Sequence, residues 1–245
     1  MVSTSVINIY SVINVRKNVP FHYKQILSCK ALKFIADLHL NFDSRRLELS
    51  GMNTAIVNPA TDSNINPIIS QLKYLRSGRL ADEFVDRNIK VIYPTTQFYL
   101  NEIHTFTESL YIVDFESEPS PNWEKMIEGQ INLKDFIYQT HPVNLPEYSE
   151  SEVLVEKIVP VIVQPRSLHS NEENILVNKQ PVSAALFDFG LFFFHNTKKL
   201  IEQGYAPYFY LPNIGNHFEA KFWDDICHFA EDQIAVPRNI TQVLV

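Results

Sequence analysis

The sequence is poor in glycine and cysteine, and it has no long apolar run. Only 6 of the 245 residues are glycine, and no glycine-rich phosphate loop occurs, so nucleotide folds built on such loops lose support. Cys29 and Cys227 are too few and too far apart for a disulfide framework or a thiolate metal site, so we expect free thiols in a reducing compartment. No apolar run approaches the length of a transmembrane helix.

Positive charge is also scarce. The chain carries 21 Lys and Arg against 28 Asp and Glu, a net charge of −7 at pH 7. This balance argues against binding nucleic acid or an anionic membrane through bulk charge, and a small anionic substrate would need a locally basic pocket. Hydrophobic residues make up 45% of the chain, which is ample for a buried core. We therefore expect a folded protein whose partners include no nucleic acid and no membrane.

Strand-like and helical patterns alternate from residue 90 onward. Strands separated by helices of this length predict parallel βαβ units. Before this region, residues 50–88 indicate a connecting segment with one helix around Ile69–Val85. The expected strands are Lys90–Tyr93, Leu110–Phe115, Ile158–Val163, Tyr208–Leu211 and Ile240–Val245, and the expected helices are Asn122–Ile137, Ala184–Gln203 and Asn216–Asp232.

Capping residues mark several helix ends. Ser28 and Ser183 each stand where a hydroxyl can cap the first turn of an apolar-periodic segment. Asn216, with Glu219 three residues later, predicts a capping box. Gly204 stands where a left-handed residue would end the preceding helix.

Three stretches resemble one protein family in the same order. Residues 181–233 contain FDFGLFFFHN, PYFYLP and NHFEAKFWDD; Tyr111–Asp135 reads YIVDFESEPSPNWEKMIEGQINLKD; and Val161–His169 reads VIVQPRSLH. All three closely resemble the malate synthase family, in its shorter isoforms. The resemblance implies an acyltransferase of the glyoxylate cycle, which condenses acetyl-CoA with glyoxylate and water to give malate and CoA.

The resemblance also implies an eight-stranded TIM (β/α)8 barrel, which typically takes about 250 residues. The alternating region here is enough for only about four βα units. We therefore expect an α/β chain with a partial barrel over residues 89–245, preceded by an N-terminal helical, clasp-like segment and linker over residues 1–88. On this view the sequence corresponds to the N-terminal portion of a longer protein.

Arg166 is the sharpest candidate for chemistry. It follows an expected strand, and chemistry in such barrels sits at the carboxyl ends of strands. By resemblance it matches the arginine of the family motif Arg-Pro-Arg-Gly-Trp-His, which here reads Gln164-Pro165-Arg166-Ser167-Leu168-His169. A fixed guanidinium could stabilise the enolate that forms on the acetyl group, so Arg166 is our predicted catalytic residue. The alternative is an arginine that pairs with Asp or Glu at a strand end.

Asp114 and Glu116 are the predicted substrate-binding residues. They match the family stretch Asp-Phe-Glu-Asp-Ser, which by resemblance lies near the acetyl-CoA side of the site. Two carboxylates two residues apart also suggest a metal or acid–base role, but accepting hydrogen bonds that position a loop is the simpler interpretation. His195 lies in an aromatic-rich helix, where a hydrogen-bonded packing role is commoner than a ligand role.

The resemblance implies Mg²⁺, but it places the metal ligands and the catalytic Asp beyond the last residue of this sequence. Departures from the family at Gln164, Ser167, Leu168 and Gly215 point the same way. The alternative function is therefore an inactive remnant that binds CoA-like ligands or associates with another subunit. We find no clear targeting signal and expect a cytoplasmic protein, or a peroxisomal or glyoxysomal one in a eukaryote.

Overall fold

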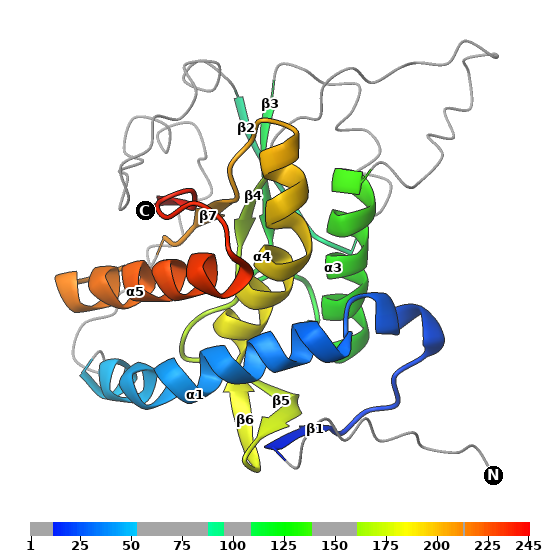
Figure 1. Ribbon diagram of the computed structural model, residues 1–245, viewed down its shortest axis with the longest axis vertical. Coiled ribbons are helices and arrows are strands. Elements are labelled where there is room, and N and C mark those ends of the chain that lie inside the picture. The colour runs from blue at the N-terminus through cyan, green and yellow to red at the C-terminus, as the bar shows by residue number, and fades with distance from the viewer. Residues whose placement is uncertain (1–11, 53–87, 96–108, 139–160, 213) are drawn as a thin grey trace.

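The computed structural model describes residues 12–52, 88–95, 109–138, 161–212 and 214–245 (Figure 1). Five parallel strands form its central sheet. The order is β2-β3-β4-β7-β8, and every neighbouring pair is parallel. The strands are β2 (Asn88–Ile92), β3 (Ser109–Asp114), β4 (Val161–Gln164), β7 (Tyr208–Tyr210) and β8 (Gln242–Leu244).

Helices follow three of these strands in the chain. They are α3 (Trp123–Tyr138) after β3, α4 (Ala184–Glu202) between β4 and β7, and α5 (His217–Ile234) between β7 and β8. This order confirms the predicted βα alternation. Among the described residues β2 and β8 each pair with one strand and not with each other, so the sheet is open, as a partial barrel requires.

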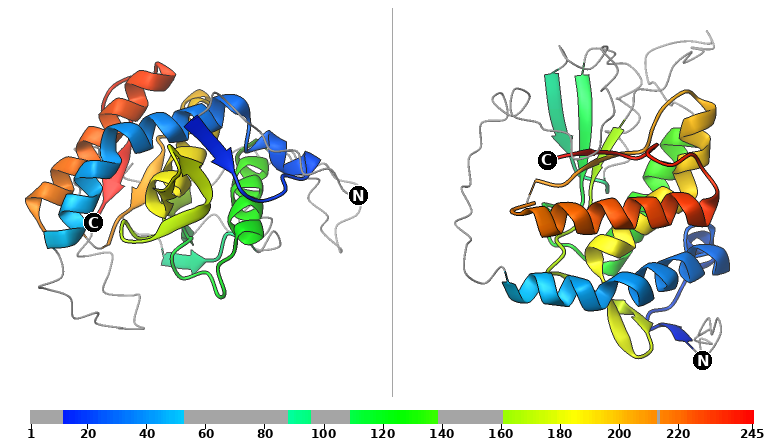
Figure 2. Two further views of the ribbon diagram at one scale, coloured as in Figure 1. Left: turned by 90° about the horizontal axis from the view of Figure 1, so that it is seen from below. Right: turned by 60° about the vertical axis from the view of Figure 1, so that its left-hand side comes forward.

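The N-terminal region packs onto these helices. It comprises β1 (Ile13–Val15), the 3₁₀ helix η2 (Phe21–Gln25) and α1 (Cys29–Met52), and α1 packs against both α4 and α5 (Figure 2). β1 joins a small antiparallel sheet with β5 (Asn171–Val177) and β6 (Gln180–Ser183), two strands that the sequence analysis did not predict. The helix expected at Ile69–Val85 lies outside the described residues.

The predicted caps are present. Ser28 Oγ accepts the Ala31 N–H at 3.2 Å, and Ser183 Oγ accepts the Leu186 N–H at 3.4 Å. Asn216 Oδ1 accepts the N–H groups of residues 218 and 219, while the Glu219 carboxylate reaches back to the Gly215 N–H at 2.8 Å, one residue before the N–H that a standard capping box uses. Residue 204 has φ +83°, the left-handed conformation that glycine tolerates best. These local signals fix where α1, α4 and α5 begin and where α4 ends.

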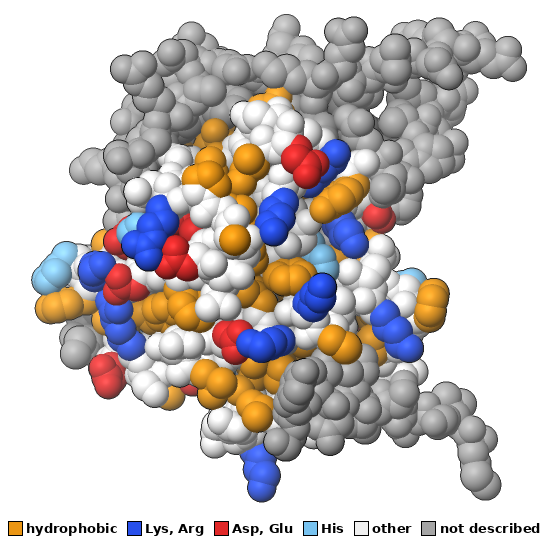
Figure 3. Space-filling model, viewed as in Figure 1, with side chains coloured by type: hydrophobic (Ala, Val, Ile, Leu, Met, Phe, Trp, Pro, Cys, Tyr) orange, Lys and Arg blue, Asp and Glu red, His pale blue; other side chains and the backbone are white. Residues whose placement is uncertain are grey.

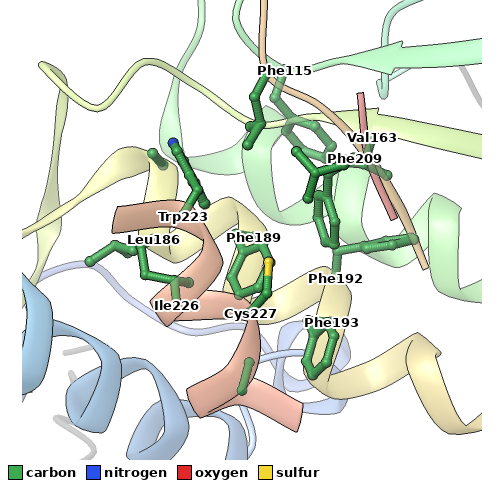
Figure 4. Close-up of a cluster of buried hydrophobic side chains, with 14 of the residues drawn as sticks. Phe115, Val163, Leu186, Phe189, Phe192, Phe193, Phe209, Trp223, Ile226 and Cys227 are labelled. Atoms are coloured by element: carbon green, nitrogen blue, oxygen red, sulfur yellow. The ribbon is translucent and has the colours of Figure 1, made fainter. Parts of the chain in front are cut away.

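Aromatic side chains fill the space between the sheet and its helices (Figure 4). Phe189 of α4 lies with its ring centroid 4.7 Å from that of Phe209 on β7 and 5.7 Å from that of Trp223 on α5. Each fully buried Phe is worth roughly 1.5–3 kcal/mol relative to an exposed one. This cluster therefore holds α4 and α5 against one face of the sheet.

The helices α1 and α4 approach closely at Gly190. A Cβ atom at this position would clash with the side-chain ends of Ile35 and Leu38 on α1, both fully buried. A glycine here thus permits the helix crossing that seats the N-terminal region on the partial barrel.

Charged side chains are dispersed over the face of the molecule that is seen in Figure 1. Figure 3 shows basic side chains scattered among acidic ones, without a single large basic patch on this face. Among the described residues, none of the helices combines the length and the apolar character needed to cross a membrane.

Candidate functional site

The carboxyl edge of the sheet presents three polar side chains on one face. Along β3, residues 111 and 113 join the cluster under the helices, whereas residues 110 and 112 join a separate cluster on the opposite face. Because strand side chains alternate, Asp114 continues the face opposite the helices. Gln164 of β4, directly paired with Asp114, and Tyr210 of β7 continue it in the same way. In a closed barrel this face is the interior.

Asp114 shapes the turn that follows β3. Its Oδ1 atom accepts the N–H of Glu116 at 2.8 Å and of Ser117 at 3.1 Å, and the residue is only 4% exposed. Its negative charge, after burial, also raises the pKa of Tyr210. Asp114 therefore lies between a loop that it orders and a tyrosine on the same face.

Glu116 lies beyond the end of β3 and connects two loops. Its Oε2 atom accepts the backbone N–H of Ser167 at 2.5 Å, so the turn after β3 is tied to the segment after β4. The two predicted carboxylates thus accept hydrogen bonds that position loops, as the simpler interpretation of the sequence holds. Whether they also contact a substrate stays a prediction.

Arg166 is held by two carboxylates. Its Nε and Nη2 atoms donate to the two oxygens of Asp188 at 2.8 and 2.9 Å, and its Nη1 atom donates to Glu172 Oε2 at 3.0 Å. Its backbone N–H also donates to Asp188 Oδ2 at 3.0 Å. A bidentate guanidinium–carboxylate pair of this kind is geometrically strict, so the arm of Arg166 has one fixed direction.

Burial and charge act in opposite directions on this triad. Burial alone would lower the pKa of Arg166, but the Asp188 and Glu172 carboxylates raise it above its ordinary value. Burial raises the pKa of Asp188, and the Arg166 guanidinium opposes that rise. The guanidinium is therefore cationic, and it is what makes a charged Asp188 tolerable in a fully buried position.

The described carboxylates do not form a metal site. No group of three or more His, Cys, Asp or Glu side chains with suitable geometry occurs within the described ranges. Asp114 and Glu116 accept backbone N–H groups, while Glu172 and Asp188 accept from Arg166. These residues therefore do not fit the magnesium ion that the family resemblance implies.

Sequence patterns point to Arg166 but not to either of its partners. Asp188 stands in the apolar run ALFDFGLFFF, and an acid surrounded by large apolar residues is a signal of a buried ion pair. Glu172 offers no such signal, because it lies in the polar start of β5, a strand that was not predicted. Gln164 was noted only as a departure from the family motif, although its strand-end position places it beside Asp114.

The open parallel sheet, its covering helices and the polar residues at its carboxyl edge together define an α/β protein of the barrel class. Comparison with known proteins specifies the class further. The family model described as "Malate synthase, TIM barrel domain" matches residues 160–245. That range contains β4, Arg166 and both of its carboxylate partners.

Similarity extends beyond this range. The chain is 32% identical over 236 residues to "Malate synthase, glyoxysomal" of Candida tropicalis, covering 93% of this chain and 43% of that protein. It is 34% identical over 233 residues to "Bifunctional glyoxylate cycle protein" of Caenorhabditis elegans, covering 91% and 24%. It is 32% identical over 229 residues to "Malate synthase" of Myxococcus xanthus, covering 91% and 42%. The chain therefore spans less than half the length of these relatives. It is malate synthase-like, which confirms the predicted resemblance.

Proposed function

We propose that the protein catalyses the malate synthase reaction, in which acetyl-CoA and glyoxylate condense and the thioester is hydrolysed to malate and CoA. The observation that carries this proposal is sequence similarity over about nine-tenths of the chain to proteins named malate synthase. That similarity favours the catalytic interpretation over a remnant that only binds CoA-like ligands or another subunit.

The segment after β4 has two alternative roles in this reaction. In the first role Arg166 is the predicted catalytic residue. It would stabilise the negative charge of the enolate with the guanidinium N–H groups that do not donate to its two carboxylate partners. Three of its five side-chain N–H bonds donate to Asp188 and Glu172. The summed charge of these three side chains is −1, however, which would weaken attraction of an anion. This balance supports the second role, in which Arg166 fixes the segment and does not touch the enolate.

Asp114 and Glu116 are proposed to contribute to the acetyl-CoA side of the site. Asp114 faces the sheet side opposite the helices, and Glu116 holds the backbone of Ser167. Their proposed effect is to shape the edge against which the substrate lies. Mg²⁺ is proposed as the cofactor that would polarise the glyoxylate carbonyl, and no metal-binding cluster of His, Cys, Asp or Glu occurs among the described residues.

The remaining expectations also stand as proposals. We assign residues 1–88 to an N-terminal helical segment and linker, and residues 89–245 to the partial barrel. The packing of α1 on α4 supports a clasp-like role for the first segment. The proposed location is the cytoplasm, or the peroxisome or glyoxysome of a eukaryote; the name of the Candida relative supports the second.

The test measures thiol release from acetyl-CoA by the purified full-length protein, with glyoxylate and Mg²⁺ present. We expect CoA release that requires glyoxylate; release that is absent, or unchanged when glyoxylate is omitted, overturns the proposed function.

A neutral triple variant, Arg166→Gln with Glu172→Gln and Asp188→Asn, then separates the two roles of Arg166. If the guanidinium contacts the enolate, this variant folds but stays at least about 100-fold impaired. If the guanidinium only fixes the segment, the triple variant keeps much of the turnover of the unmodified protein.

A further inference from the structure

The segment 165–170, which joins β4 to β5 and carries Arg166, is bonded from several elements. Two of its anchors belong to the site already described: Asp188 of α4 holds Arg166, and Glu116 after β3 holds the Ser167 N–H. Within the segment, Ser167 accepts from two further amides, those of His169 and Ser170. Four backbone N–H groups of this segment are therefore hydrogen-bonded.

A third anchor comes from α1, more than a hundred residues earlier in the chain. Arg46 donates from Nη1 to the backbone oxygen of Leu168 at 2.7 Å and from Nη2 to Asn171 Oδ1 at 3.1 Å. These two contacts span the end of segment 165–170 and the first residue of β5. The next residue, Glu172, is the one that pairs with Arg166. Arg46 thus bonds to the chain on both sides of the turn that leads to this partner.

The Arg46 side chain is also held by a residue of its own helix. Its Nε atom donates to Asp43 Oδ1 at 2.6 Å, one helical turn earlier on α1. Only 3% of the residue is exposed, so water competes little for its donors. A planar guanidinium spreads its five N–H donors over three nitrogens in a rigid fork, so it can reach acceptors on different sides, whereas an ammonium group directs its three donors from a single nitrogen. Because this charge is buried and donates to a backbone oxygen and an amide oxygen, it constrains the segment more strongly than a surface ion pair would.

We propose that Arg46 is a positioning residue of the active site, acting through segment 165–170. The inference rests on the proposed function, because that function gives the segment its role. α1 then contributes to catalysis without touching substrate: it fixes the path of the backbone between Arg166 and Glu172. Loss of Arg46 releases the Leu168 oxygen and Asn171 together and lets the segment move.

The neighbouring arginine supplies a matched control. Arg45 also leaves α1, but it donates to Asp225 of α5 at 2.6 Å and its guanidinium lies 5.4 Å from the Phe222 ring. Arg45→Ala therefore removes the same side chain from the same helix without touching segment 165–170. Arg46→Lys keeps the charge but not the fork, and Asn171→Ala removes one acceptor while leaving Arg46 intact.

The experiment combines amide hydrogen exchange with steady-state kinetics on the full-length protein. In Arg46→Ala we expect exchange of the amides of residues 166–170 to accelerate by about tenfold or more, with Arg46→Lys intermediate and Arg45→Ala unchanged. We expect kcat, corrected for the folded fraction, to fall about 10- to 100-fold with KM changed less than about threefold.

The two readouts separate the inference from the proposed function. If the unmodified protein shows no glyoxylate-dependent CoA release, the function fails, and the exchange data alone decide whether Arg46 anchors the segment. Equal exchange in the Arg46 and Arg45 variants overturns the inference. So does an unchanged kcat in Arg46→Ala. Should Arg46→Ala fail to fold, Arg46→Lys and Asn171→Ala carry the same comparison.

Discussion

Arg166 and Asp188 depend on each other for their burial. Asp188 is fully buried and the Arg166 side chain is only 12% exposed, so neither charge has water to replace a lost partner. We expect Arg166→Gln to lower the free energy of unfolding by about 3–5 kcal/mol, because it leaves Asp188 and Glu172 uncompensated. Urea denaturation followed by circular dichroism measures this loss.

The control for that loss is the neutral triple variant of Arg166, Glu172 and Asp188. Neutral side chains that can still hydrogen-bond carry no uncompensated charge, so we expect most of the stability to return. A triple variant as unstable as Arg166→Gln would show that the charges themselves hold this part of the fold. An exposed pair such as Arg238–Asp232 gives the background, since water screens its charges and its loss should leave the free energy of unfolding nearly unchanged.

His195 makes stability depend on pH. Burial lowers its pKa from 6.5 to about 4, although its Nε2 atom lies 2.7 Å from the Ile26 carbonyl oxygen, which favours a protonated nitrogen there. The pKa of His195 is lower in the folded than in the unfolded protein, so the unfolded protein binds the proton first as the pH falls. The contribution of neutral His195 to the free energy of unfolding is therefore fully present above pH 6.5 and is lost as the pH falls toward 4. We expect the free energy of unfolding to drop by about 2 kcal/mol between pH 7 and pH 5 from this residue.

The measurement compares urea denaturation at the two pH values in the unmodified protein and in His195→Gln. The amide of Gln can still donate to Ile26 but does not titrate, so the drop between pH 7 and pH 5 should shrink by about 2 kcal/mol. An equal drop in both proteins would place the acid sensitivity elsewhere.

Sequence reasoning could locate the candidate residues but not their contacts. Arg166 and Asp114 were placed correctly at the ends of adjacent strands, because strand ends are local features of the sequence. The partners of Arg166 lie 6 and 22 residues further along, at Glu172 and Asp188. Pairing over such separations depends on how β5 and α4 return to the sheet, which local patterns do not reveal.

Among the elements, the β5–β6 hairpin carries backbone strain. Its turn residues Asn178 and Lys179 both have positive φ, 49° and 68°, as a type I′ turn requires. Asparagine tolerates this conformation, but lysine does not favour it. We expect Lys179→Gly to raise the free energy of unfolding by about 1 kcal/mol, measured by the urea midpoint. Lys179→Ala, which removes the side chain but keeps the Cβ atom, should not stabilise; equal gains in both variants would contradict the argument.

The same turn explains why the hairpin was missed. Asn-Lys is a weak hairpin signal compared with Asn-Gly, and β5 begins with the polar run Asn171–Asn174. The five strands of the main sheet and α3, α4 and α5 were predicted, because their apolar periods and caps agree. What the sequence could not show was the register of β5 with β1, which joins segments more than 150 residues apart.

Across the whole molecule, the N-terminal region and the partial barrel share buried surface. Phe34 and Leu38 of α1 belong to the same apolar cluster as Phe189, Phe209 and Trp223. The Arg46 contacts add a polar connection between the same parts. Because a shared core couples the stability of its members, we expect α1, α4 and α5 to unfold together.

The two thiols report on that cooperativity. Cys29 is exposed at the start of α1, whereas Cys227 of α5 is fully buried in the shared core. In the native protein we expect a thiol-reactive probe to label Cys29 rapidly and Cys227 about 10³-fold or more slowly, since labelling Cys227 requires opening of the core. Mass spectrometry of timed samples measures both rates, and Cys29→Ser should abolish the fast phase.

Gly190→Val, which forces a clash between α4 and α1, should accelerate Cys227 labelling on α5 if the parts unfold as one. If Gly190→Val accelerates hydrogen exchange of α1 but leaves the labelling rate of Cys227 unchanged, α1 detaches independently of α5.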